Sequence, residues 1–134
     1  MGKRVAVFPA GRQDLYTRNK SSAAIALGGF LFISGQVGSR EDGSPEDDPE
    51  RQLRLAFDNL NAVLAAGGCA FEDIVDFTIY IVDPEPVLDV VFKVRDEFWG
   101  DAPYPTITAV GVTWLYGFRF ELKVTAKLPE SPAR

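Results

Sequence analysis

The chain has 134 residues, of which 46% are hydrophobic and 25% charged, with a net charge of −5 and no histidine. This length and composition predict one globular domain spanning residues 1–134. The acidic balance weakens the case for a nucleic-acid interface, because sequence-independent affinity for nucleic acids comes mainly from Lys and Arg. The lack of histidine excludes serine–histidine and cysteine–histidine catalytic pairs and histidine-based metal sites.

Hydrophobic segments in this sequence are short. The longest, residues 23–34, is interrupted by Gly28 and Gly29, and it falls short of the ~20 residues that a membrane-spanning helix needs. Residues 1–10 lack the long apolar segment of a signal peptide. Cys69 is the only cysteine, so neither a disulfide nor a thiolate metal cluster can form within one chain. We therefore expect a cytoplasmic protein with no membrane partner, no metal and no cofactor.

The first third of the chain predicts strands. Residues 4–8 alternate in hydrophobicity, and the proline after them ends this short strand. Residues 11–20 are polar and predict a loop. Residues 23–27 and 30–34 are apolar runs joined by Gly28–Gly29, a pattern typical of a β-hairpin. The segment that follows is rich in Gly, Ser, Pro and acidic residues and predicts a surface loop.

A strong helix start follows at Asp48, with Pro49 in the first turn and Glu50 near the positive end of the helix. The apolar residues after it recur on one helical face, and Gly67–Gly68 predicts the end of the helix. The expected buried face consists of Leu53, Ala56, Phe57, Leu60, Val63 and Leu64.

The second half of the chain alternates between strands and a helix. Residues 74–82 predict a strand with apolar side chains on both faces. Pro84 and Pro86 predict the start of a second helix, whose buried face consists of Val87, Val90, Val91, Val94 and Phe98. Residues 106–115 and 118–128 predict two strands around a short turn, and hence a terminal hairpin.

Two helices can cover only one face of a sheet built from these strands. The uncovered face would expose apolar side chains, and burial against another copy of the chain is the simplest way to remove them from water. The sequence therefore predicts an α+β domain with a mixed sheet, two helices on one face, and self-association through the other.

An ordered set of segments between Ser21 and Ala126 resembles the Rid family of reactive intermediate deaminases, also called YjgF-like or endoribonuclease L-PSP-like. The segments are Phe32–Val37 (FISGQV), the helix residues Gln52, Ala56, Asn59–Leu60 and Val63–Gly67, the strand residues Asp73–Val75 and Thr78, and the stretches Pro105–Leu115 and Phe120–Leu122.

This resemblance implies a chorismate-mutase-like fold and a homotrimer whose ligand clefts lie between adjacent subunits. Members of the best-known branch of the family hydrolyse reactive enamines and imines to a keto acid and ammonia, while other members have been called endoribonucleases. The implied partners are a small-molecule ligand and further copies of the chain, and nucleic acid is not expected.

The cleft residues of the family persist only in part. By the resemblance, Glu121 matches the glutamate that positions the attacking water, and Gly35 matches the glycine of the cleft. Ser21 stands where a tyrosine is frequent, Phe92 stands at the place of an asparagine, and Ile107 stands at the place of the arginine that clamps a substrate carboxylate. We take Glu121 as the candidate catalytic residue and the other four as candidate ligand-binding residues.

These residues also have ordinary structural interpretations. Glu121 lies between Arg119 and Lys123 at two-residue spacing, as a charge on the polar face of a strand does. Ile107 can equally be an ordinary strand residue. Arg119, Lys123 and Arg95 are cations that could replace the missing arginine, but their spacing in the sequence does not place any of them in a cleft.

Three functions remain open at this point. The first is a trimeric protein that binds a small metabolite between subunits, either as a binding protein or as a hydrolase of a non-standard substrate. The second is an imine or enamine deaminase that uses another cation, and the third is an endoribonuclease. Loss of the arginine disfavours the second function, and the acidic charge and lack of histidine disfavour the third. Because Ile107 offers no partner for a buried carboxylate, we expect a neutral or weakly polar ligand.

Overall fold

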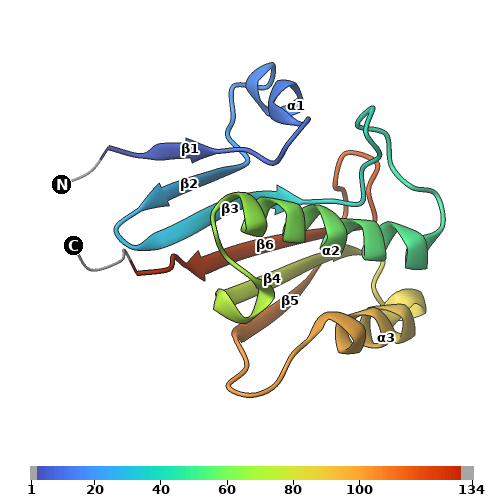
Figure 1. Cartoon of the computed structure of the whole chain (residues 1–134). Helices are drawn as coiled ribbons and strands as arrows, with labels where there is room; N and C mark the ends of the chain where they lie inside the picture. The colour runs from blue at the N-terminus through green and yellow to red at the C-terminus, as the bar shows by residue number, and fades with distance from the viewer. Residues whose placement is uncertain (1–2, 131–134) are drawn as a thin grey trace.

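Six strands form one mixed sheet in the computed structural model, which describes residues 3–130. The strands lie in the order β1-β2-β3-β6-β4-β5 (Figure 1). Their bounds are Val5–Val7 for β1, Ala24–Leu27 for β2, Phe30–Gln36 for β3, Ile74–Val82 for β4, Thr106–Val112 for β5 and Phe120–Lys127 for β6. The α-helices are α1 (Gln13–Thr17), α2 (Pro49–Ala66) and α3 (Leu88–Phe98), with single 3-10 turns at η1 (Phe71–Asp73) and η2 (Glu85–Val87).

The β2–β3 hairpin forms where the sequence predicts it. Leu27 pairs with Phe30 across a two-residue turn, and Gly28 and Gly29 have φ angles of 63° and 85°. Two consecutive residues in the left-handed region match the twist of antiparallel strands, and glycine adopts this conformation without strain. The predicted hairpin is confirmed.

The predicted terminal hairpin is wrong. β6 pairs antiparallel with both β3 and β4, whereas β5 pairs parallel with the other edge of β4. β4 therefore separates β5 from β6, and residues 113–119 carry the chain across the end of β4 (Figure 1). The parallel pairing is possible because α3 lies between β4 and β5, and parallel strands need such a crossover connection.

α2 begins and ends where the sequence predicts. The Asp48 carboxylate caps the helix by accepting the Arg51 amide at 2.9 Å. The buried face contains all six predicted apolar residues, and Gln52 is buried with them. The side-chain oxygen of Gln52 accepts the Arg119 amide at 2.7 Å, and its nitrogen donates to the Glu46 carbonyl at 2.8 Å. These bonds tie α2 to the segment that leads into β6.

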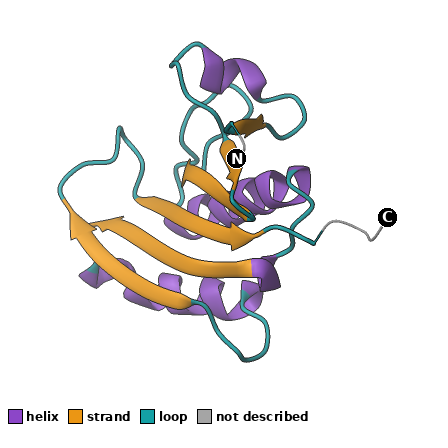
Figure 2. Cartoon of the chain, turned by 90° about the vertical axis from the view of Figure 1, so that its left-hand side faces the viewer, coloured by secondary structure: helices purple, strands orange, loops and turns teal. Residues whose placement is uncertain are grey.

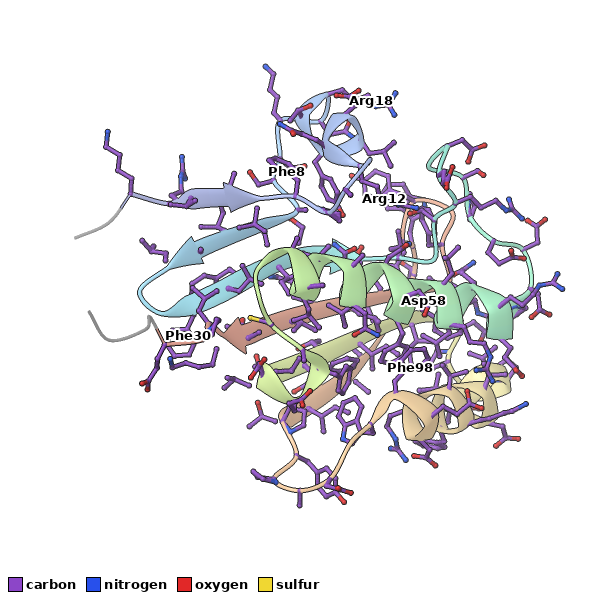
Figure 3. The ribbon with its side chains drawn as sticks, viewed as in Figure 1. Phe8, Arg12, Arg18, Phe30, Asp58 and Phe98 are labelled. Atoms are coloured by element: carbon purple, nitrogen blue, oxygen red, sulfur yellow. The ribbon has the colours of Figure 1, made fainter. Side chains whose placement is uncertain are left out.

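α2 and α3 lie on the same face of the sheet (Figure 2), so the predicted α+β fold with two helices on one face is confirmed. The aromatic ring of Phe57 joins the layers, because it stacks on Phe77 of β4 at 5.9 Å and on Phe98 of α3 at 4.6 Å. Figure 3 shows Phe98 between the two helices. α1 lies in a segment predicted to be a loop, and its Tyr16 packs against Phe8.

α2 and α3 leave the opposite face of the sheet uncovered, and we call it the open face. Phe32 of β3 is 44% exposed there. Strict alternation along β4 predicts Val75 on the same face as Phe77, and this prediction is wrong. An irregularity between Ile74 and Asp76 buries Ile74 and leaves Val75 exposed. Exposed apolar side chains such as Phe32 are the surface that self-association would bury.

Candidate functional site

Glu121 lies on the open face of β6. Its neighbours Phe120 and Leu122 are buried under the helices, and the alternation of the strand turns the carboxyl group the other way, into register with Tyr80 of β4. Glu121 is half-buried. Burial raises the pKa of its carboxyl group, and the charge of Lys123 opposes that rise. A carboxylate of this kind is well suited to accept a proton from water.

Gly35 lies directly beside Glu121. A Cβ atom on Gly35 would be 2.5 Å from the carboxyl carbon of Glu121. The glycine therefore leaves the space in which the carboxyl group rests against β3. Gly35 also falls within the irregular pairing of β3 with β6, between Ile33 and Gln36, so the local backbone departs from a regular ladder at the site.

Ser21 lines a surface pocket of about 460 Å³ together with Ser34, the residue before Gly35. The Ser21 hydroxyl donates to the Tyr16 carbonyl at 3.2 Å. Arg4 and Lys20 line the same pocket. Sequence reasoning missed both cations. Arg4 lies before the region of resemblance, whereas Lys20 is adjacent to Ser21, which is the signal that could have identified it.

Ile107 and Phe92 lie on the other side of the sheet from Glu121. Ile107 pairs with Phe77, whose side chain is in the core beneath the helices, and it is 50% exposed at the edge strand β5. It lines a second pocket of about 450 Å³ with Arg95, Trp99 and Tyr104, among others. Phe92, on α3, is exposed, and the Arg95 guanidinium lies 5.1 Å from the centre of its ring.

The structure places the five predicted residues in two separate groups, which we call half-sites. Glu121 and Gly35 are in contact on the open face, with Ser21 in a neighbouring pocket. Phe92 and Ile107 meet on the helix side through Arg95. One chain does not bring the two groups together, since Glu121 shares its face with Tyr80 while Ile107 shares the opposite face with Phe77.

The three candidate replacements for the missing arginine differ in their surroundings. The Arg119 guanidinium donates to the Val82 carbonyl at 2.7 Å and to the Asp83 carbonyl at 2.8 Å. The Lys123 ammonium donates to the Ile33 carbonyl. Arg95 lines the Ile107 pocket. The sequence did not predict the location of Arg95 in this pocket.

Within residues 3–130, His, Cys, Asp and Glu side chains do not gather in groups of three or more that could hold a metal ion. None of the helices within the same range is long and apolar enough to cross a membrane.

Comparison with known proteins extends these observations. The family model described as endoribonuclease L-PSP matches residues 11–128. The chain is 58% identical over 130 residues to the RutC family protein YjgH of Escherichia coli, which covers 97% of this chain and 99% of YjgH. A solved structure of protein YjgH is similar with a TM-score of 0.92 at 57% identity, covering 97% of this chain and all of that one.

A second relative is TdcF of Escherichia coli, whose name describes a candidate reactive intermediate deaminase. It is 31% identical over 94 residues, which are 68% of this chain and 72% of TdcF. A crystal structure of TdcF with bound serine is similar with a TM-score of 0.71 at 28% identity, over 81% of this chain and 87% of TdcF. The chain therefore belongs to the endoribonuclease L-PSP family, also known as the YjgF/RutC/Rid family.

Proposed function

We propose that this protein is a homotrimer that binds a small metabolite between subunits and hydrolyses a polarised double bond in it. The observation that carries the proposal is the location of Ile107 and Glu121 on opposite faces of one sheet. One chain cannot close a site around both residues, whereas a second copy packed on the open face can present its Ile107 pocket to Glu121. The cytoplasmic location expected from the sequence is part of this proposal.

The surroundings of Glu121 support a hydrolytic role. Burial raises the pKa of its carboxyl group, which makes it a better proton acceptor near neutral pH than a fully exposed glutamate. In the proposed reaction, Glu121 accepts a proton from water as the water oxygen adds to the carbon of a protonated C=N bond, which gives a carbinolamine. It returns this proton to nitrogen, and it accepts the hydroxyl proton as the C–N bond breaks and the C=O bond forms. The products are a carbonyl compound and ammonia or an amine.

Deamination of the imines of free amino acids is the second candidate function. Similarity to TdcF, which has been crystallised with serine, favours it. Ile107 counts against it, because a short carboxylate entering the cleft would find an apolar side chain where the family arginine stands. The description of the family as endoribonucleases favours an RNA substrate. The net charge of −5 disfavours it, because RNA is also negatively charged.

Assembly is tested first. Light scattering after size exclusion is expected to give about three times the chain mass of 14.7 kDa. The mass of one chain would overturn the proposal, because the two half-sites would then remain apart.

Hydrolysis is tested with a panel of imines derived from keto acids, ketones and aldehydes. Glu121→Gln is expected to lower the rate on the best substrate by at least ~100-fold, the usual contribution of a general base. Asp58→Asn is the matched control, because it makes the same carboxylate-to-amide change at an exposed position on α2 (Figure 3). An undiminished rate in Glu121→Gln would exclude the catalytic role.

A further inference from the structure

Arg95 and Ile107 line one pocket, and the geometry points to Arg95 as the cation that binds a ligand carboxylate in this protein. The inference rests on the proposed function, since it assigns chemistry to one half of the same cleft. The presence of Arg95 beside Ile107 leads us to expect an acidic ligand instead of the neutral or weakly polar ligand predicted from Ile107 alone. The ligand class that follows is a carboxylate attached to a flat apolar group.

Two neighbours on α3 hold the Arg95 guanidinium in place. Its Nε and Nη2 atoms donate to one carboxylate oxygen of Asp96, at 3.0 and 2.7 Å. Its carbon lies 5.1 Å from the centre of the Phe92 ring, within the range of a cation–π interaction. Phe92, which replaces a polar residue of the family, therefore acts as a platform for the charge.

The contact with Asp96 occupies only one edge of the guanidinium. The Nε–Nη2 edge is taken. Within residues 3–130, no hydrogen-bond acceptor meets the adjacent edge, which is formed by Nη1 and the second N–H of Nη2. This edge presents two parallel N–H donors, the arrangement that binds a carboxylate in a bidentate manner. Arg95 can therefore bind the Asp96 carboxylate at one edge and a ligand carboxylate at the other.

The other cations discussed above have different roles. Arg119 is bound to two backbone carbonyls near the end of β4. Lys123 lies on the open face, where its ammonium is bound to a carbonyl of β3. Arg4 and Lys20 line the Ser21 pocket, which shares no lining residue with the Ile107 pocket. Among these five cations, Arg95 alone lines the pocket at the position of the family arginine.

The rest of the pocket favours a flat apolar group on the ligand. Ile107, Trp99, Tyr104 and Pro105 contribute apolar and aromatic surface around Arg95. Asp96 also lines the pocket, where its charge is paired with that of Arg95. The volume of about 450 Å³ falls within the 300–1,000 Å³ that is typical of sites for ligands much larger than a three-carbon acid. We therefore expect an aromatic or similarly flat carboxylate to fill it better than pyruvate does.

Calorimetric titration of the purified protein tests the inference. Benzoate and phenylpyruvate are expected to bind at least ~10-fold more tightly than benzamide and pyruvate, because a charge-assisted bond contributes more than a neutral one. Arg95→Gln should weaken benzoate and phenylpyruvate by roughly 10- to 100-fold and leave benzamide unchanged. Arg119→Gln is the control and should retain the preference for acids.

A further variant separates the open edge from the charge. Arg95→Lys keeps the charge but lacks the two parallel donors, so it should lose most of the preference for acids. Equal binding of benzoate and benzamide by the wild type would overturn the inference while leaving the proposed cleft intact. Loss of acid preference in Arg119→Gln but not in Arg95→Gln would also overturn it.

Discussion

The carboxyl group of Glu121 occupies the space that a side chain on Gly35 would need, since a Cβ atom there would come within 2.5 Å of the Glu121 carboxyl carbon. Gly35→Ala should therefore displace the Glu121 side chain rather than the backbone, because the far end of a flexible side chain can move away. We expect unfolding free energy to change by less than about 1 kcal/mol, while hydrolysis falls as it does in Glu121→Gln. Denaturant unfolding and imine hydrolysis measure the two effects.

Gly38→Ala provides the contrast. A Cβ atom on Gly38 would overlap the backbone carbonyl oxygen of Gln52, and a buried helix backbone cannot move aside as a side chain can. This substitution should cost about 1–3 kcal/mol of unfolding free energy. Equal stability losses in Gly35→Ala and Gly38→Ala would show that Gly35 has a packing role and makes no special place for Glu121.

Glu121→Gln should stabilise the isolated fold, and the gain should depend on pH. Burial raises the pKa of the Glu121 carboxyl group above its ordinary value of 4.5, so the neutral form favours folding. That contribution is fully present below pH 4.5 and is lost as pH rises through the higher pKa of the folded state. Thermal unfolding of both proteins between pH 4 and 8 should show a difference that grows toward neutral pH. A difference independent of pH would mean that burial does not perturb this carboxyl group.

Ile107→Arg should increase deamination of 2-iminopropionate. The wild type is expected to be tens to thousands of times slower on this small substrate than arginine-bearing relatives. Ile107 makes no charge-assisted bond at the position of the family arginine, which costs roughly 2–5 kcal/mol, and the pocket around Arg95 fits a larger acid. Imine decay with and without protein gives the rates, and Ile107→Met is the control for side-chain size. A wild-type rate that already equals that of the relatives would show that a small carboxylate finds another cation.

Ribonuclease activity should be absent from highly purified protein. The chain carries a net charge of −5 and no histidine, so it has weak long-range attraction for RNA and lacks the usual acid–base pair. Incubation with a labelled single-stranded RNA measures cleavage. Activity that co-purifies through successive columns and disappears in Glu121→Ala would contradict this expectation.

Local signals in the sequence predicted most of the helices and strands but not the order in which the strands pair in the sheet. The Asp48 cap, the Gly28–Gly29 turn and the apolar face of α2 are encoded by adjacent residues, and each appears in the structure. The position of β4 between β5 and β6 depends on long-range pairing, which alternation of side chains does not reveal. The irregular pairing between Ile74 and Asp76 was likewise not predicted, because it depends on the partner strand.

The candidate site likewise has features that the sequence predicts and features that depend on long-range packing. The resemblance names Glu121 and Gly35 separately as cleft residues, and their contact is seen only in the structure. Arg95 could not be placed in advance, since its position in the Ile107 pocket depends on how α3 packs over the edge strand and on its contacts with Asp96 and Phe92. The separation of the two half-sites depends on strand order and register, which the sequence pattern did not specify.

Crosslinking between chains tests most directly the claim that two copies build each cleft. In a Cys69→Ser background, one preparation carries Ile107→Cys and a second carries Lys123→Cys, on the same face as Glu121. After refolding together, a short bis-maleimide should join a chain of one kind to a chain of the other. The same treatment of Ile107→Cys with Asp58→Cys, which is exposed on α2, should give no such product. Efficient crosslinking to position 58 but not to position 123 would contradict a cleft formed between the Ile107 pocket of one subunit and the Glu121 face of the next.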